Sequence, residues 1–150
     1  MRKSLKSLTP ILLAVCLPDS VNGETEIEKS ATRGYVLWKC AALATLAGYD
    51  EEKITPYFLN GHALLSTFIT DMIERKVTDE QLKNIPVGIL WNLSGGPSVD
   101  FRLGVIWARI EDDQFNRTRF EDSGDKSKEL QQHKAELDFM ASNCNLLLTP

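Results

Sequence analysis

The segment from Trp91 to Gly104, WNLSGGPSVDFRLG, places glycines, a proline and two serines between two apolar stretches. Such a loop could bind a phosphate or present a nucleophilic serine. A phosphate-binding loop needs Lys and then Ser or Thr after its second glycine, but Pro97 and Ser98 stand there. A nucleophile elbow needs a glycine on both sides of its serine, and Ser94 and Ser98 each have glycines on one side only. Both kinds of chemistry are therefore disfavoured.

The same loop suits a turn between two helices. Gly95 and Gly96 permit the positive backbone angles that end a helix, and Pro97 suits a first helical position. Asp100, in the first turn of the next helix, opposes the helix dipole. A rigid exposed turn is also a suitable recognition element. We therefore predict that a partner contacts the loop at Ser94, Gly95, Gly96, Pro97 and Ser98.

Paired carboxylates offer a second kind of chemistry. The candidate pairs are Asp71 with Glu74, and Glu111 with the adjacent Asp112 and Asp113. One partly buried carboxyl of such a pair could serve as a general acid while the other serves as the base. Acids with this spacing on amphipathic helices are more often a solvated face. A cell-envelope hydrolase is therefore the alternative function, not the leading one.

The sequence contains few cysteines and histidines that could act in catalysis or bind a metal. A cysteine nucleophile needs a free thiolate beside a histidine, for which Cys40 and His62 are the sensible pair. His62 and His133 are the only histidines, and neither has another ligand-type residue at a spacing typical of zinc sites. We predict no metal site, no cofactor and no catalytic residue.

Three tryptophans, Trp38, Trp91 and Trp107, could line a pocket for a small apolar ligand, which is a further alternative function. Each tryptophan lies in an apolar stretch, and large aromatic side chains dominate the burial of a small domain. We therefore expect all three to be core residues first.

The N-terminal 23 residues have the order of a secretory signal. Arg2, Lys3 and Lys6 precede an apolar run over residues 8–17 that is too short to span a bilayer, and cleavage is expected after Gly23. A lipoprotein signal acylated at Cys16 and an apolar helix retained in the fold are the two alternatives. The pattern predicts a periplasmic or secreted protein with no stable membrane insertion after cleavage.

Loss of the signal leaves two cysteines, Cys40 and Cys144. Because exported chains pass through an oxidising compartment, we predict that these two form a disulfide. The enclosed loop of about 100 residues corresponds to roughly 4 to 5 kcal/mol in the chain-entropy model.

The charge of the remaining chain is acidic. Three of the 17 basic residues and one of the 21 acidic residues lie in the signal, which leaves 14 against 20 and a net charge of −6. Nucleic acid and anionic lipid are therefore disfavoured as ligands, whereas a basic protein partner is favoured.

The elements that position these residues are predicted to be helices, because apolar residues recur at three- and four-residue spacing. The expected helices cover residues 31–47, 56–76, 79–84, 86–93, 97–120 and 127–143. Residues 24–30 are expected to be mobile with little to bury. The fold class is thus all-α, a compact orthogonal bundle of five to six helices with one disulfide, in a single domain over residues 24–150.

Two inward faces are expected in the second half of the chain. The first comprises Phe101, Leu103, Ile106, Trp107, Ile110 and Phe115. The second is a heptad-like stripe of Leu130, His133, Leu137, Met140 and Cys144. This stripe would direct Cys144 into the same core as Cys40.

Two stretches carry a resemblance to known proteins. GYVLWKCAALATLAG, residues 34–48, and the terminal NCNLL resemble small exported proteins of Gram-negative bacteria. Tyr35, Trp38 and Cys40 are similar in kind and order to the first helix of periplasmic immunity proteins against type VI secretion cell-wall amidases. The resemblance implies an exported, non-enzymatic binding protein that inhibits a cell-envelope enzyme, and it assigns no inhibitory residue.

Overall fold

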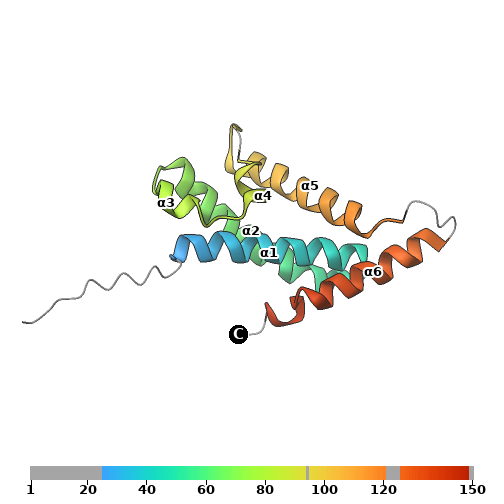
Figure 1. Ribbon diagram of the computed structural model, residues 1–150. Helices are drawn as coiled ribbons and strands as arrows, with labels where there is room; N and C mark the ends of the chain where they lie inside the picture. Colours follow the sequence, from blue (N-terminus) through green and yellow to red (C-terminus); the bar gives the residue numbers. More distant parts are fainter. Residues whose placement is uncertain (1–24, 94, 121–125, 149–150) are drawn as a thin grey trace, which may run out of the picture.

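The computed structural model describes residues 25–93, 95–120 and 126–148, so the predicted signal segment lies outside the described residues. The described helices are α1 (Glu26–Leu46), α2 (Glu51–Ile73), α3 (Asp79–Leu82), α4 (Val87–Leu90), α5 (Val99–Thr118) and α6 (Ser127–Ala141), followed by the 3-10 turn η2 (Cys144–Leu146). Figure 1 shows α5 on one side of α1 and α6 on the other. The described ranges contain no strand, which confirms the all-α prediction.

Helices α1 and α2 form the central hairpin of the bundle. Asp50 caps the start of α2, where its side chain accepts a hydrogen bond from the backbone of Lys53 at 3.0 Å. The two helices cross at Gly34 and Gly61, and a Cβ at Gly61 would lie 3.0 Å from the carbonyl oxygen of Gly34. The absence of a side chain at Gly61 thus permits the close backbone contact between α1 and α2.

The core consists of two clusters on either side of α1. The first lies beneath α4 and α5 and includes Leu65, Phe68 and Ile106, each at most 1% exposed. The second lies beneath α6 and includes Leu37 and Phe139. Trp107 packs against both clusters and so joins them.

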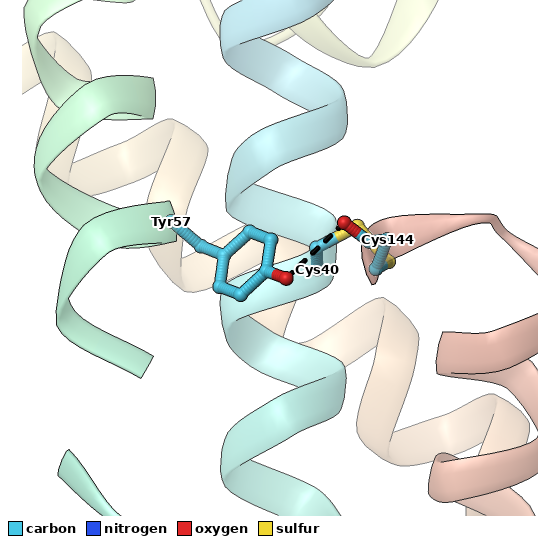
Figure 2. Close-up of a disulfide and its surroundings, with 3 residues drawn as sticks. All are labelled: Cys40, Tyr57 and Cys144. Carbon is cyan, nitrogen blue, oxygen red and sulfur yellow. Dashed lines mark hydrogen bonds between the residues drawn. A yellow bond between two sulfur atoms is a disulfide. The ribbon is translucent and has the colours of Figure 1, made fainter. Parts of the chain in front are cut away.

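The predicted disulfide is present between Cys40 and Cys144, whose Cα atoms are 5.7 Å apart. Figure 2 shows the bridge between α1 and the C-terminal turn, beside Tyr57 of α2. The bridge lies within the second cluster, and both cysteines are at most 1% exposed.

The helical stripe that was expected to direct Cys144 inward is nevertheless wrong, although Cys144 itself is buried. Leu130, Leu137 and Met140 are 42 to 49% exposed, and His133 is exposed as well. Helix α6 instead buries Ala135 and Phe139. The helical register does not reach Cys144, because α6 ends at Ala141 and Asn143 adopts a left-handed conformation with φ of 53°.

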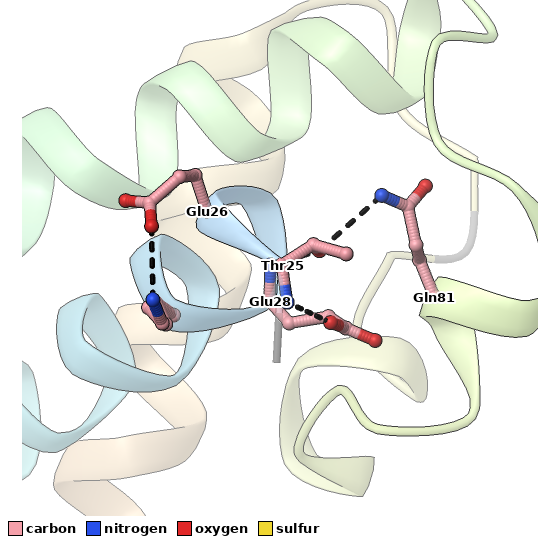
Figure 3. Close-up of polar contacts among 5 residues, drawn as sticks. Thr25, Glu26, Glu28 and Gln81 are labelled. Atoms are coloured by element: carbon pink, nitrogen blue, oxygen red, sulfur yellow. Dashed lines mark hydrogen bonds and ion pairs between the residues drawn. The ribbon is translucent and has the colours of Figure 1, made fainter. Parts of the chain in front are cut away.

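The first helix starts earlier than expected, and residues 25–30 are ordered. Thr25 and Glu28 form a capping box at the start of α1. The Glu28 side chain is 3% exposed and accepts a hydrogen bond from Asn84 at 2.7 Å, while Gln81 donates to the Thr25 hydroxyl at 3.3 Å. Figure 3 shows this junction between α1 and α3. The capping box makes Glu28 a helix-starting residue, which the acidic composition of the segment concealed.

Two further expectations are corrected. Helix α2 is continuous from Glu51 through Pro56, so Pro56 does not begin a separate helix. On α5, Phe101 and Phe115 are 51% and 45% exposed, and Gln114 occupies the buried face instead. The buried positions of α5 follow a narrower stripe than the sequence indicated.

Candidate binding surface

The loop before α5 ends one helical segment and begins the next, as predicted, but the residue that begins α5 differs from the one expected. Ser98, not Pro97, begins α5: it is the N-cap, and its hydroxyl accepts a hydrogen bond from the backbone of Phe101 at 3.1 Å. Gly95 has a positive φ of 29°, a backbone conformation that would be strained in a residue with a side chain. Gly95, Pro97 and Ser98 are exposed. Ser94 lies outside the described residues.

Contacts from α5 hold this loop in place. The guanidinium of Arg102 donates to the carbonyl oxygens of Leu93 and Gly96, each at 3.4 Å. The ring of Phe101 packs on Gly96 so closely that a Cβ there would collide with it. Arg102 therefore ties both ends of the turn to the helix that follows, which makes the turn a pre-organised element.

Trp91, expected in the core, is the most exposed large apolar side chain in the described part of the chain. Trp91 directly follows α4 and is 78% exposed, while Val87 at the start of α4 is 57% exposed. Helix α4 is one turn long and fully buries only Ile89, while Val87 before it and Trp91 after it are exposed. The exposure of Trp91 was not evident from the sequence, because residues 86–93 form one apolar run, whereas a helix of one turn buries only one of its sides.

A groove of 490 Å³ runs beside Trp91, between α1, α4 and α5. Its walls include Tyr35 of α1, Gly88 of α4, and Arg109 and Asp113 of α5. Burial, and then the negative charge of Asp113, raise the pKa of Tyr35, so its hydroxyl keeps its proton and can donate a hydrogen bond. Within the described part of the chain, neither Arg109 nor Asp113 forms an ion pair. The groove thus combines an aromatic rim with one donor and two charges of opposite sign.

We use the name α4–α5 surface for two neighbouring sets of exposed residues. Val87, Trp91, Arg109 and Asp113 lie at the groove, and Gly95, Pro97, Ser98 and Phe101 belong to the turn that follows α4 and to the start of α5. Sequence reasoning found the loop but missed Trp91, Arg109 and the role of Tyr35. The four-residue offset between Val87 and Trp91 places both on one side of a helical turn, which is the signal that could have grouped them.

The predicted carboxylate pairs occupy different surroundings. Asp71 and Glu74 both contact the ammonium of Lys76, at 3.4 and 2.5 Å, and the hydrogen bonds that Lys76 donates to Glu74 and then to Asp71 raise the pKa of Lys76. On α5, partial burial raises the pKa of Glu111. The α5 acids do not act as one unit, because only Asp113 lines the groove.

Cys40 and His62, the candidate cysteine–histidine pair, do not form a catalytic site. Cys40 is in the disulfide, so it offers no thiol to His62. His62 instead lies beside the rings of Trp38 and Phe58, with centroid distances of 6.2 and 6.3 Å. Over the described ranges, no cluster of three or more His, Cys, Asp or Glu residues is placed to hold a metal ion.

The structure brings together two of the three tryptophans. The rings of Trp38 and Trp107 meet edge to face at 5.5 Å, and the indole N–H of Trp38 donates to the carbonyl of Phe58 at 2.9 Å. Trp91 lies on the other flank of α5, so a box of three tryptophans does not form.

Comparisons with protein-family models, curated proteins and solved structures find no match for this chain. Among the described residues, no helix is long and apolar enough to cross a membrane.

Proposed function

We propose that this chain is an exported, non-enzymatic binding protein that contacts a protein partner through the α4–α5 surface. The observation that carries the proposal is Trp91, 78% exposed on a segment held in place by packing and by Arg102. Contiguous exposed apolar patches mark interaction sites, and tryptophan is enriched among the residues that dominate binding energy.

Pre-organisation supports the choice of this surface over the other exposed apolar residues. The turn of residues 95–98 is fixed before binding by the Ser98 cap, by Arg102 and by the packing of Phe101 on Gly96. A surface that is already ordered loses little conformational entropy when a partner binds. The groove beside Trp91 adds a tyrosine hydroxyl and two unpaired charges that can define specificity.

The class of partner follows from charge and compartment. The predicted mature chain has a net charge of −6, which attracts a basic protein over long range. The buried disulfide suits an oxidising compartment such as the periplasm or the extracellular space. Together with the resemblance of residues 34–48 to immunity proteins, these features support an inhibitor or immunity protein against a cell-envelope enzyme.

Site-specific photocrosslinking in the native host tests this proposal. A photoreactive phenylalanine analogue replaces Trp91 in one variant and Leu137 of α6 in a matched control, because Leu137 is also an exposed apolar residue, at 47%. We expect one defined protein adduct at position 91 and none of that mass at position 137. Absence of an adduct at position 91, or the same set of adducts at both positions, would exclude the α4–α5 surface as the binding site.

The inhibitor form of the proposal has its own test. The captured partner is identified by mass spectrometry and assayed on its substrate with and without the purified chain. We expect a cell-envelope enzyme whose activity falls when the chain is added in equimolar amount. A partner without enzymatic activity, or an enzyme that the chain leaves unaffected, would exclude the inhibitor while leaving the binding function in place.

A further inference from the structure

A second cleft lies on the opposite flank of α5 from the groove, between α5 and α2, with a volume of 280 Å³. The residues that line it and carry its chemistry are Trp38, Phe58, His62, Asp100, Gly104 and Trp107. Its two ends differ, since one is aromatic and the other holds a carboxylate.

The aromatic end is rigid. Phe58 and Trp107 meet edge to face with centroids 4.9 Å apart, and Trp38 stacks on Phe58 at 5.7 Å. Trp38 is 1% exposed and its N–H donates to the carbonyl of Phe58, so it supports the wall from behind, and Phe58 and Trp107 face the cleft. Such a wall attracts the aliphatic stem of a ligand and, through the ring quadrupoles, a positive charge.

Asp100 is the only charged residue in the lining of this cleft. It is exposed, and in the described part of the chain it makes no hydrogen bond or ion pair. Helix α5 is open between the carboxylate and Trp107, because a Cβ built on Gly104 would meet no atom within 4 Å. A slender group can therefore enter over Gly104 with its charge near Asp100.

We propose that this cleft receives a lysine or arginine side chain of the protein partner. The inference rests on the proposed function and assigns the basic partner a specific anchor. The aliphatic stem packs on Trp107 and Phe58, and the terminal cation lies near Asp100 and the ring faces. Long basic side chains bury their stems on apolar surface in this way while the charged end stays near water. An acidic side chain is repelled by Asp100, and an apolar side chain leaves the carboxylate without a counter-charge.

Amide-capped single residues test the cleft without the partner. N-acetyl-lysine methylamide and N-acetyl-arginine methylamide are titrated into the full chain, and the indole N–H of Trp107 and the backbone amide of Gly104 are followed by NMR. The norleucine analogue matches the lysine stem without its charge. We expect saturable shifts with at least one cationic probe and an affinity about tenfold weaker for norleucine, a size typical of a cation held by aromatic rings. No saturable shift with either cationic probe, or equal binding of norleucine, overturns the proposal.

Two variants locate the binding. Asp100→Asn removes the charge and is expected to weaken the cationic probe while the aromatic rings keep part of its advantage over norleucine, whereas Asp112→Asn on the exposed face of α5 is expected to leave it unchanged. Gly104→Leu fills the cleft and is expected to abolish the shifts of Trp107, while the better helix propensity of leucine preserves the fold. Unchanged probe binding in Gly104→Leu overturns the proposed location.

The outcome is separable from that of the proposed function. Probe binding reports on the cleft alone, and photocrosslinking at position 91 reports on the α4–α5 surface alone. If a partner crosslinks at position 91 but the probes cause no saturable shifts, the binding function is supported and only the proposed lysine or arginine site is excluded.

Discussion

The phenolic hydroxyl of Tyr57 donates a hydrogen bond to the carbonyl oxygen of Cys144 at 3.1 Å, across a sequence separation of 87 residues. Cys144 is at the same time bonded to Cys40, so α1, α2 and the C-terminal turn are joined at one buried point (Figure 2). This point closes the bundle at the side opposite to the α4–α5 surface.

Removal of the disulfide is expected to lower the stability of the whole bundle. The double variant Cys40→Ala with Cys144→Ala should lose about 2 to 5 kcal/mol of unfolding free energy, because its unfolded chain is no longer closed into a long loop. Chemical denaturation with and without reductant measures this loss in the unaltered chain, and intact mass counts the thiols. Two free thiols in the oxidised protein, or a midpoint that reductant does not change, would contradict the bridge.

Two helix glycines are expected to respond in opposite directions to the same substitution. Gly61→Ala should destabilise by about 1 to 3 kcal/mol, since its Cβ would press on the Trp38 ring and the backbone of Gly34. Gly104→Ala should stabilise by about 0.5 to 1 kcal/mol, because its Cβ meets nothing and alanine favours the helix. Urea denaturation of the two variants measures both changes. If both variants changed the unfolding free energy equally, the effect of Gly61→Ala would be due to helix propensity and not to the crossing of α1 and α2.

Glu28 is expected to make the junction of α1 and α3 sensitive to acid. Hydrogen bonds from the side chain of Asn84 and then from Thr25 hold the pKa of Glu28 below its usual range. For a carboxyl with a lowered pKa, the stabilisation is fully present above its unfolded pKa of about 4.3 and is lost as the pH falls through the lower folded pKa.

Glu28→Gln is therefore expected to lower Tm at pH 7 by more than it does near pH 3. Thermal melts across that range measure the difference between the two proteins. Glu26→Gln serves as the control, because Glu26 forms an exposed ion pair with Lys29 at 2.9 Å. A Tm difference for Glu28→Gln that is constant from pH 3 to pH 7 would contradict the lowered pKa.

Much of the fold follows from short-range patterns in the sequence. The cap at Thr78 with Gln81, the caps at Asp50 and Ser98, and the close approach at Gly61 are local properties of side-chain chemistry or size. The disulfide follows from cysteine number and the expected compartment, and it is correct although the helical stripe offered in its support is wrong. Local chemistry identifies individual caps and the cysteines that remain to pair, but the expected starts of α1 and α2 were wrong.

Burial of single residues was harder to predict, because it depends on which elements lie opposite. Glu28 is buried because the segment of α3 and the residues after it return to the start of α1, where Asn84 donates a hydrogen bond to Glu28. Trp91 is exposed only because α4 is a single turn that already buries Ile89. Both facts depend on contacts between segments distant in the chain, which periodicity within one segment does not report. The loop of the candidate surface was therefore predictable, whereas its tryptophan was not.

The affinity of the captured partner for the Trp91→Ala variant tests the binding function most directly. The matched control is Leu137→Ala, which truncates an exposed apolar side chain of α6. We expect the dissociation constant to rise at least about tenfold for Trp91→Ala, as for a dominant interface residue, and to stay unchanged for Leu137→Ala. Both variants should keep the Tm of the unaltered chain. Full affinity in a folded Trp91→Ala protein would contradict the α4–α5 surface as the site of binding.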